Sequence, residues 1–487
     1  MQDPKGLPGE TEPGRVLSMS DQAAAGFFGR TRSAFVNTWR DILGAAKHKL
    51  SAAVHPDLPP DDLDRLRLQI EECLTARGGE VSARARAADL GTTYLGLNEA
   101  GRIRFLGLLA RDYGFDRRMV ETTIANLHKA PDASRYAAAA GELRQALIPP
   151  RLRLLRQFST LGEGIKFLSD LRADVMRYAK SDPTLVSLDA ELRDLLASWF
   201  DIGFLDLRRI TWESPAALLE KLIDYEAVHE IQSWADLKNR LDSDRRCYAF
   251  FHPRMPNEPL IFIEVALVSG MADNVQTLLD ELAPHQDPKT ADSAIFYSIS
   301  NAQKGLAGVS FGGFLIKRVV DDLAHDFPNL KTFATLSPIP GFRAWLEEQI
   351  GVDRPVLAMP EAHDIAHALG TENADTALLD LLRQPGWAED PAKADIVRPV
   401  LLRLCARYLL TEKRGTQALD PVARFHLSNG ARVERLNWLA DKSPRGLRQS
   451  AGIMVNYRYK LEEIEANHEA YTGEGRIAAA PAVRGLL

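Results

Sequence analysis

The chain contains few cysteines and no long hydrophobic stretch. Its 487 residues include three cysteines, Cys73, Cys247 and Cys405, which lie far apart in the sequence. An odd number of widely spaced cysteines does not favour a disulfide framework or a cysteine-rich zinc site, so a reducing cytoplasm is the simplest setting. No uninterrupted apolar run reaches the ~18 residues that a membrane-spanning helix needs, so we expect no membrane partner.

Basic charge and targeting signals are also missing. The formal net charge is −6, whereas proteins that bind nucleic acid carry a basic surface, so we predict no nucleic-acid partner. The first residues, MQDPKGLPGETEPGRVLSM, lack the apolar centre of a signal peptide and contain the acidic residues that transit peptides avoid. The final residues, AVRGLL, do not match a peroxisomal signal. These features together predict a cytoplasmic protein.

The composition is that of a globular protein with a large core. Hydrophobic residues make up 45% of the chain and charged residues 26%. The length predicts two or more domains. Residues 1–20 are rich in proline, glycine and acids, and we expect them to be disordered. In residues 21–185, Leu, Ile and Phe recur at spacings of three and four, which predicts an α-helical domain.

Residues 186–487 have a different pattern, in which short β-rich runs alternate with helical segments. The predicted strands are 247–253, 258–270, 293–300 and 330–338, because these runs are rich in aromatic and β-branched residues. Residues 360–412 return to a helical pattern, and residues 423–441 combine a short strand with an Asn-Gly turn. We therefore predict an α+β protein, with an all-helical N-terminal domain followed by an α/β domain.

A glycine-rich stretch, AQKGLAGVSFGGFLIKRVVDDL, occupies residues 302–323. It joins a predicted strand to an amphipathic helix, and the glycines allow the backbone to approach an anion. The free N–H groups of the first helical turn would then point at that anion. The stretch matches neither the Walker pattern nor G-x-G-x-x-G. It therefore indicates either a phosphate-binding loop of another kind or a plain tight turn.

Two short strings contain residues with catalytic chemistry. Ser337 lies in TLSPIPGF at a predicted strand end, where two prolines stiffen the backbone. His426 lies in RFHLSNGA, where we expect it to close a short strand. A turn serine and a packed histidine fit the same patterns, so the residues alone leave both interpretations open. His363 and His367 form H-x3-H without the H-E-x-x-H frame, and we predict no metal site there.

Four strings resemble, in order, the malonyl-CoA decarboxylase family. They are FYSISNAQKGLAGVSFGGFLIKRVV, LSPIPGF, FHLSNGA and NWLADKSPRGLRQSAGIMVNYRY. With GIKFLSDLRAD, SWFDIGFLDLRRITW and EPLIFIEVAL upstream, the resemblance extends over residues 150–465. It implies a helical N-terminal domain used in self-association, and hence a homo-oligomer, either a dimer or a tetramer. It also implies a catalytic domain with the GNAT acyltransferase fold.

The activity implied by the resemblance is conversion of malonyl-CoA to acetyl-CoA and CO2. Loss of CO2 leaves an enolate that must be stabilised and protonated. No cofactor is expected, since the thioester is the electron sink and coenzyme A is part of the substrate. An N-acetyltransferase with the same fold is the alternative, and it would release a free thiol. A non-enzymatic acyl-CoA sensor is a third interpretation.

The resemblance also implies roles for particular residues. His426 would donate the proton, Ser337 would bind the malonyl carboxylate or carbonyl and assist the transfer, and Tyr459 would donate a hydrogen bond into the site. The implied substrate-binding set comprises Ser298 beside the acyl group and, around the pyrophosphate, Ala307, Gly308, Val309, Ser310, Phe311, Gly312 and Gly313. Some family members have an acidic residue at the position of Ser310, so the acid that would orient His426 is not identified.

Overall fold

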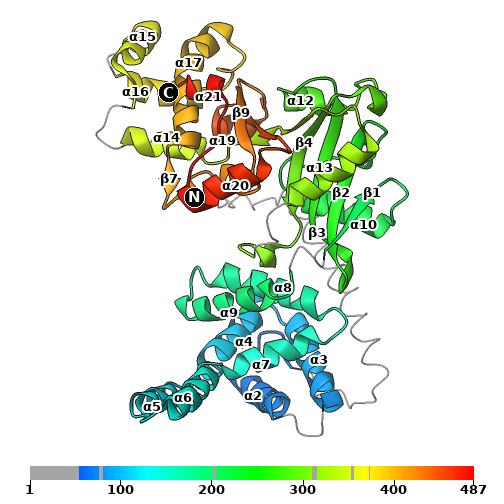
Figure 1. Cartoon of the computed structure of the whole chain (residues 1–487), viewed down its shortest axis with the longest axis vertical. Helices are drawn as coiled ribbons and strands as arrows, with labels where there is room; N and C mark the ends of the chain where they lie inside the picture. The colour runs from blue at the N-terminus through cyan, green and yellow to red at the C-terminus, as the bar shows by residue number, and fades with distance from the viewer. Residues whose placement is uncertain (1–53, 76–79, 201–204, 310–314, 352–355, 372) are drawn as a thin grey trace, which may run out of the picture. The chain divides into compact units, whose positions relative to one another are not determined.

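The computed structural model describes residues 54–75, 80–200, 205–309, 315–351, 356–371 and 373–487 (Figure 1). The chain divides into two compact units, Met1–Leu195 and Leu196–Leu487. The expected boundary after residue 185 lies earlier, before the last helix of the first unit. The expected disorder of residues 1–20 concerns a segment outside the described residues.

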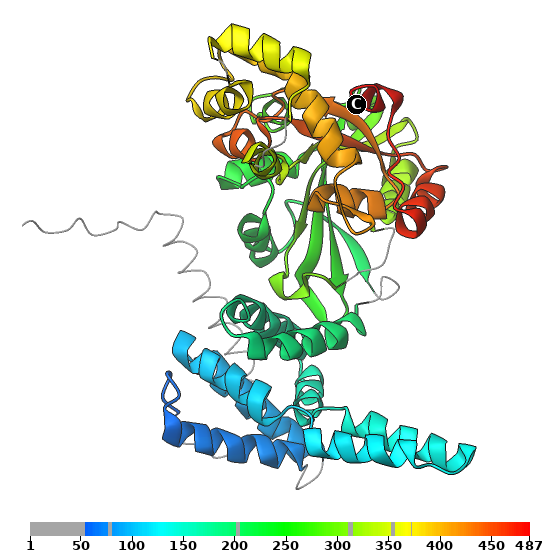
Figure 2. The same ribbon diagram turned by 90° about the vertical axis from the view of Figure 1, so that its left-hand side faces the viewer.

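The first unit is helical throughout its described part, as the apolar spacing predicts. Its helices are α2 (Pro60–Leu74), α3 (Glu80–Gly96), α4 (Glu99–Asp112), α5 (Arg117–His128), α6 (Ala133–Ala146), α7 (Pro150–Ser159), α8 (Gly164–Tyr178) and α9 (Val186–Ala197). Asn98, Asp116 and Asp132 cap α4, α5 and α6 by accepting hydrogen bonds from backbone N–H groups of the first turn. The helices α5 and α6 lie side by side as a hairpin (Figure 2).

The second unit is built on a mixed β-sheet. Its strands are β1 (Asp206–Ile210), β2 (Arg245–His252), β3 (Met255–Val268), β4 (Ser293–Asn301), β5 (Thr332–Thr335), β6 (Ser337–Pro338), β9 (Arg432–Asn437) and β10 (Met454–Tyr459). The strand order is β1-β2-β3-β4-β5-β10-β6, and β9 also pairs with β10. The pair β4–β5 is parallel, so a crossover must connect these two strands.

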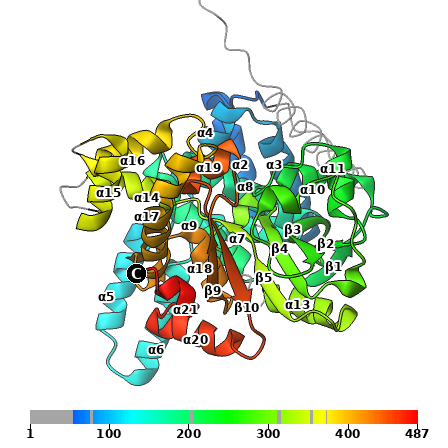
Figure 3. The same cartoon turned by 90° about the horizontal axis from the view of Figure 1, so that it is seen from above.

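The helices of the second unit cover the sheet or pack on one another. They are α10 (Ala216–Tyr225), α11 (Trp234–Arg240), α12 (Val275–Leu278), α13 (Leu315–Asp326), α14 (Phe342–Gly351), α15 (Met359–Leu369), α16 (Ala374–Arg383), α17 (Pro391–Leu410), α18 (Pro421–Ser428), α19 (Pro444–Ser450), α20 (Ile464–Glu474) and α21 (Pro481–Arg484). The strands β1–β4 lie between α13 on one face and α10 and α11 on the other (Figure 3). The remaining small ladder joins β7 (Lys413–Arg414) to β8 (Gln417–Ala418).

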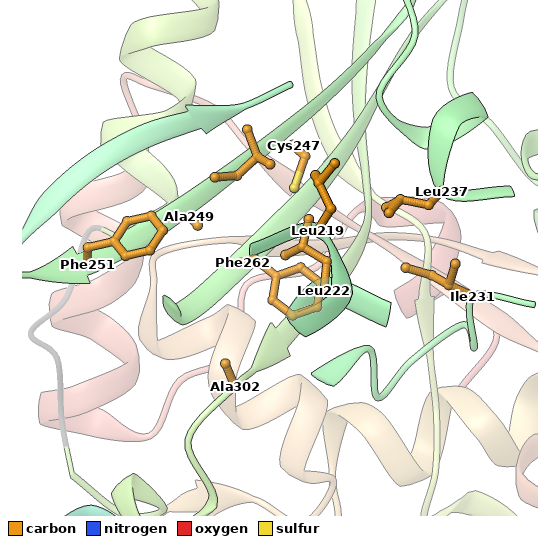
Figure 4. Packing of buried hydrophobic residues seen from close by; sticks show 10 residues of the cluster. Leu219, Leu222, Ile231, Leu237, Cys247, Ala249, Phe251, Phe262 and Ala302 are labelled. Atoms are coloured by element: carbon orange, nitrogen blue, oxygen red, sulfur yellow. The ribbon is translucent and has the colours of Figure 1, made fainter. Parts of the chain in front are cut away.

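Each face is held by apolar packing. Leu219, Leu222 and Leu237 of α10 and α11 pack on Cys247 and Phe262 of the sheet (Figure 4). On the other face, the predicted apolar stripe of α13 is confirmed for its described members, because Leu315, Val319 and Leu323 are buried. Burial of a large aliphatic side chain contributes about 1.5–3 kcal/mol, so these two layers fix the sheet between its helices.

The structure confirms the α+β class and three of the four predicted strands, and it corrects two local predictions. The predicted strand 330–338 is divided into β5 and β6, with β10 between them. His426 does not close a strand; it lies in the last turn of α18. Asp420 followed by Pro421 starts this helix, since Asp caps the free N–H groups and Pro fits the first helical position. The Asn-Gly turn then leads into β9.

Two further sequence expectations concern cysteines and membranes. Cys73, Cys247 and Cys405 are all buried free thiols, without a disulfide between them. Among the described helices, none is both long and apolar enough to cross a membrane.

Candidate active site

A buried chain of side-chain hydrogen bonds lies at the centre of the second unit. Ser337 Oγ is 3.1 Å from His426 Nε2, and His426 Nδ1 is 2.8 Å from the hydroxyl oxygen of Tyr459. Ser337 also donates its hydroxyl proton to Thr335 Oγ1 at 2.8 Å. All four residues are buried. The structure therefore brings together the three residues predicted as catalytic and adds Thr335.

Sheet pairing and a helix cap place these groups. The strand β10 lies between β5 and β6, so that Val455 pairs with Ser337 and Tyr459 pairs with Phe333. The side chains of Thr335 and Ser337 are two residues apart and point to the same face, as the period of a strand requires. His426 comes from α18 and reaches between Ser337 and Tyr459.

The hydrogen bonds assign the protonation pattern of the site. Because the Ser337 hydroxyl donates to Thr335, its oxygen accepts a proton from Nε2 of His426. The Nδ1 atom is then an acceptor and takes the hydroxyl proton of Tyr459. Thr335 Oγ1 is held in place by the backbone N–H of Tyr457 at 3.1 Å. The site thus presents a neutral imidazole whose N–H points at Ser337.

Burial keeps this imidazole neutral. It lowers the pKa of His426 from 6.5 to about 3. The ring of Tyr457 stacks on the imidazole at 4.6 Å between centroids, with 23° between the planes. Burial also raises the pKa of Tyr459 well above its usual value, so that its hydroxyl stays a donor. Within the described part of the chain, a tyrosine and not a carboxylate orients His426.

The low pKa of His426 makes stability depend on pH. Below pH 6.5 the unfolded chain binds a proton at this residue that the folded chain does not bind until about pH 3. The stabilising contribution of the neutral imidazole is therefore complete above pH 6.5 and is lost as the pH falls toward 3. At pH 5 the loss is about 2 kcal/mol, from the 1.4 kcal/mol that one pKa unit represents.

We expect wild type to lose about 2 kcal/mol more unfolding free energy than His426→Asn between pH 7 and pH 5, in urea unfolding curves. Other buried groups also respond to pH. Burial lowers the pKa of His229 to about 4, which acts in the same direction, and raises that of Glu264 to about 8, which acts in the opposite direction. The effects of His229 and Glu264 cancel in the comparison, since wild type and His426→Asn both contain these residues. Parallel curves for the two chains would contradict the assignment.

Ser298 lies outside this hydrogen-bonded chain. It pairs with Glu264 in the register of β3 and β4, at an irregularity next to Val265. Its hydroxyl is 2.8 Å from both carboxylate oxygens of Glu226, and Ser300 donates to the same carboxylate at 3.1 Å. Backbone N–H groups of Val228 and His229 donate to Glu226 as well. The donor of Ser298 is thus already occupied by a carboxylate.

The glycine-rich loop is described only in its first part. Lys304–Leu306 form a short 3-10 helix, followed by Ala307, Gly308 and the buried Val309. Gly308 has φ of +74°, a conformation that glycine adopts without strain. The predicted substrate-binding residues Ser310, Phe311, Gly312 and Gly313 lie outside the described residues.

Pattern reading missed four residues around the site: Thr335, Glu226, Tyr457 as the stacking partner of His426, and Asp420 at the start of α18. Only Asp420 had a local signal, the Asp-Pro pair of a helix start. The others come near the site through strand pairing and loop packing, which leave no short motif. In the described ranges, no group of three or more His, Cys, Asp or Glu side chains is placed to hold a metal ion.

Comparison with known proteins finds relatives for most of the chain. Residues 203–487 match the malonyl-CoA decarboxylase C-terminal domain, and residues 113–200 match the N-terminal domain of the same family. The mitochondrial malonyl-CoA decarboxylase of Rattus norvegicus is 39% identical over 422 residues, which cover 83% of this chain and 86% of that protein. The Anser anser anser protein of the same name is 39% identical over 421 residues, covering 82% and 83%.

Solved structures agree with these relatives. The crystal structure of malonyl-CoA decarboxylase from Rhodopseudomonas palustris superposes with a TM-score of 0.80 at 44% identity, covering 87% of this chain and 99% of that one. The Agrobacterium vitis structure has a TM-score of 0.77 at 42% identity, with coverage of 87% and 99%. On its sequence, its fold and both of its domains, the chain belongs to the malonyl-CoA decarboxylase family.

Proposed function

We propose that this protein converts malonyl-CoA to acetyl-CoA and CO2. One observation of the site carries the proposal: Ser337, His426 and Tyr459 form a buried hydrogen-bonded array around a neutral imidazole. The reaction needs a group that can deliver a proton to carbon in a place from which water is excluded. The array supplies that group, and family membership supplies the substrate class.

The chemistry follows from the thioester. The bond between the carboxylate carbon and Cα breaks, CO2 leaves, and the electron pair moves into the thioester carbonyl as an enolate. Cα then takes a proton and becomes the methyl group of acetyl-CoA. Burial favours the first step, since a carboxylate removed from water is less stable than the neutral CO2 that it releases. The thioester accepts the electrons, so we propose that no cofactor takes part.

His426 is the source of the proton in this proposal. Its Nε2–H points at the Ser337 hydroxyl, which binds the malonyl carboxylate or carbonyl and assists the transfer. The Tyr459 hydroxyl holds Nδ1 and thereby keeps the Nε2 tautomer in place. A neutral imidazole is a weak acid, yet an enolate carbon is a much stronger base, so the transfer runs downhill.

Tyr459→Phe tests the tautomer assignment. Phenylalanine keeps the ring and its packing but removes the hydrogen bond to Nδ1. We expect kcat to fall about 10- to 100-fold with KM nearly unchanged, because the imidazole can then adopt the unproductive tautomer. Tyr471→Phe is the control, since that buried hydroxyl bonds only the backbone N–H of Ala418 among the described residues. Equal kcat in both variants would remove Tyr459 from the mechanism.

The activity itself is tested by following two products at once. Purified protein is mixed with malonyl-CoA, and CO2 is measured beside free thiol. CO2 with acetyl-CoA and no thiol is the expected result. Thiol release without CO2 would favour the alternative, an N-acetyltransferase. Binding of malonyl-CoA without either product would favour an acyl-CoA sensor. Activity retained after exhaustive chelation is expected if no metal takes part.

The coenzyme A subsite is proposed at the glycine-rich loop and the adjoining strand edge. We assign the pyrophosphate to residues 307–313, where the positive φ of Gly308 fits a backbone that turns toward an anion. Ser298 is assigned to the acyl end through its backbone and the oxygen of its hydroxyl, because its proton is taken by Glu226. The strand–loop–helix unit β4–loop–α13 supports the GNAT fold as the parent architecture.

Self-association is proposed through the helical unit. The α5–α6 hairpin exposes large apolar side chains that a monomer would leave in water: Phe115, Met119, Tyr136 and Leu147 are between 50% and 57% exposed. Contiguous exposed apolar surface favours an interface. We propose a homo-oligomer, a dimer or a tetramer, formed over this hairpin surface.

Charge placed on the hairpin surface tests the oligomer. The double variant Met119→Asp/Tyr136→Asp should shift the mass in light scattering toward the monomer, since two desolvated carboxylates outweigh the apolar gain. Leu68→Asp on α2, a residue 62% exposed, is the control and should keep the wild-type mass. If the double variant keeps that mass too, the interface lies elsewhere.

We also propose a cytoplasmic location, because Cys73, Cys247 and Cys405 are free thiols, and cell fractionation tests it.

A further inference from the structure

Asp420 is a buried carboxylate with no role in the chemistry described so far. Its Oδ1 atom accepts hydrogen bonds from the backbone N–H groups of Val422 and Ala423, both at 2.9 Å, and so caps α18. Its Oδ2 atom lies 3.4 Å from the donating hydroxyl of Tyr408. The backbone of Gly341 lies beside the same carboxylate, since a Cβ atom built on Gly341 would be 3.6 Å from Oδ2, and its N–H group counteracts the rise that burial causes in the pKa of Asp420. One side chain thus contacts three separate segments.

Two of those segments carry the catalytic residues. His426 lies on the helix that Asp420 caps. Ser337 begins the segment Ser-Pro-Ile-Pro-Gly that ends at Gly341, and its two prolines restrict the backbone between the hydroxyl and Gly341. Displacement of either segment would change the 3.1 Å separation between Ser337 Oγ and His426 Nε2.

The junction where Asp420, Tyr408 and Gly341 meet is closely packed. A Cβ atom on Gly341 would lie 2.2 Å from the Tyr408 hydroxyl oxygen and 3.6 Å from Asp420 Oδ2. A side chain at this position would therefore collide with Tyr408, so glycine is needed for the backbone to lie this close to the pair of Tyr408 and Asp420. The rings of Phe342 and Tyr408, with centroids 6.0 Å apart, close the other side.

We propose that Asp420 is a positioning residue that sets the distance between Ser337 and His426, because it caps the helix of His426 and lies against the segment of Ser337 at Gly341. The inference rests on the proposed decarboxylase activity for its kinetic readout. Asp390 provides the comparison within the chain. It also precedes a proline and caps its helix, α17, through Ala392 and Lys393. Its side chain is 41% exposed, however, and its partners among the described residues all lie on α17 itself.

The variant Asp420→Ser distinguishes two roles of Asp420, the capping of α18 and the bridge from α18 to the Ser337 segment at Gly341. Serine still caps a helix, but it is too short to span from Val422 and Ala423 to Gly341. We expect kcat to fall at least about tenfold with KM within about twofold, because a small misplacement of catalytic groups slows the chemical step and spares uniform binding. Asp390→Ser should leave kcat and KM at their wild-type values.

Gly341→Ala perturbs the same junction from the other side and covers the case in which Asp420→Ser fails to fold. We expect a similar loss of kcat. Adding Tyr408→Phe should restore much of it, because this change removes the hydroxyl oxygen that the new Cβ would meet first. No restoration, with both single variants folded, would count against a bridge at this junction.

A readout independent of turnover is the side-chain NMR spectrum of 15N-labelled histidine, with His426 assigned by its loss in His426→Asn. In wild type the Nε2–H proton should be observable and slow to exchange, whereas in Asp420→Ser it should broaden or shift. If wild type does not decarboxylate malonyl-CoA, the proposed function fails while this spectrum still tests the bridge. A spectrum and a kcat unchanged in Asp420→Ser would overturn the proposal and leave Asp420 as a helix cap.

Discussion

Replacing His426 with Asn will lower the rate of CO2 release from malonyl-CoA by about a thousandfold or more. A positioned general acid contributes about 10²- to 10⁴-fold, and Asn at this place offers an amide that does not transfer a proton. The asparagine side chain is close in size to the polar half of the imidazole. The ring of Tyr457 and the hydroxyl of Ser337 should therefore keep most of their packing. Coenzyme A binding, measured by calorimetry, should stay within a few fold of wild type because the loop is untouched.

His363→Ala is the matched control for this experiment. That histidine also lies on a helix of the second unit, α15, but it is exposed. Its variant should decarboxylate at the wild-type rate. A His426→Asn protein that folds, binds coenzyme A and keeps more than about a tenth of the wild-type kcat would refute the role of His426 as proton donor.

Ser337→Ala should produce the second-largest loss, about 100- to 1,000-fold in kcat. The hydroxyl is the direct partner of His426 Nε2, and its removal would take away the substrate contact and the assistance to proton transfer that we propose for it. Alanine also removes one of the two donors to Thr335 Oγ1, which keeps the backbone N–H of Tyr457, so we expect a stability loss of about 0.5–1.5 kcal/mol. A lower melting temperature is therefore expected together with the kinetic defect.

Ser428→Ala controls for loss of a serine near the site. Ser428 is on the same helix as His426, and its hydroxyl donates to the backbone carbonyl of Phe425. That variant should change kcat less than about twofold, as expected for an exchange outside the reacting groups. If Ser337→Ala behaves in the same way as Ser428→Ala, Ser337 is a turn serine, the other interpretation that its string allowed.

The fold class was predictable from the sequence because its signals are local, whereas Ser337 and His426 were singled out by the resemblance to the family. Runs of β-branched and aromatic residues predicted β2, β3 and β4 within three residues of their ends, since alternation and composition act over a few neighbouring positions. The local pattern was wrong at His426, where F-H-L suggested a strand. The apolar pair around the histidine faces the core from a helix capped by Asp420, and a short apolar string fits both structures.

The sequence did not predict which side chains from distant parts of the chain contact one another. Tyr459 and His426 are separated by 33 positions, and Ser337 and His426 by 89. The missing acid that would orient His426 was sought in the glycine-rich loop, at Ser310. In the described structure a tyrosine of β10 takes that position, because β10 is inserted between β5 and β6. Ser298 was assigned to the acyl end by the resemblance alone, and only the packing of the loop shows that Glu226 accepts its hydroxyl proton.

The amino-acid sequence by itself determined the family and the order of helical and mixed α/β parts, because these depend on residue type and near neighbours, and its resemblance to the family singled out Ser337 and His426. Only the tertiary structure decided which nitrogen of His426 carries the proton, that the imidazole stays neutral, and that Asp420 lies against the segments of both residues. Those properties depend on burial and on distances between segments far apart in the chain, and each arises only when the sheet and its helices exclude water from the site.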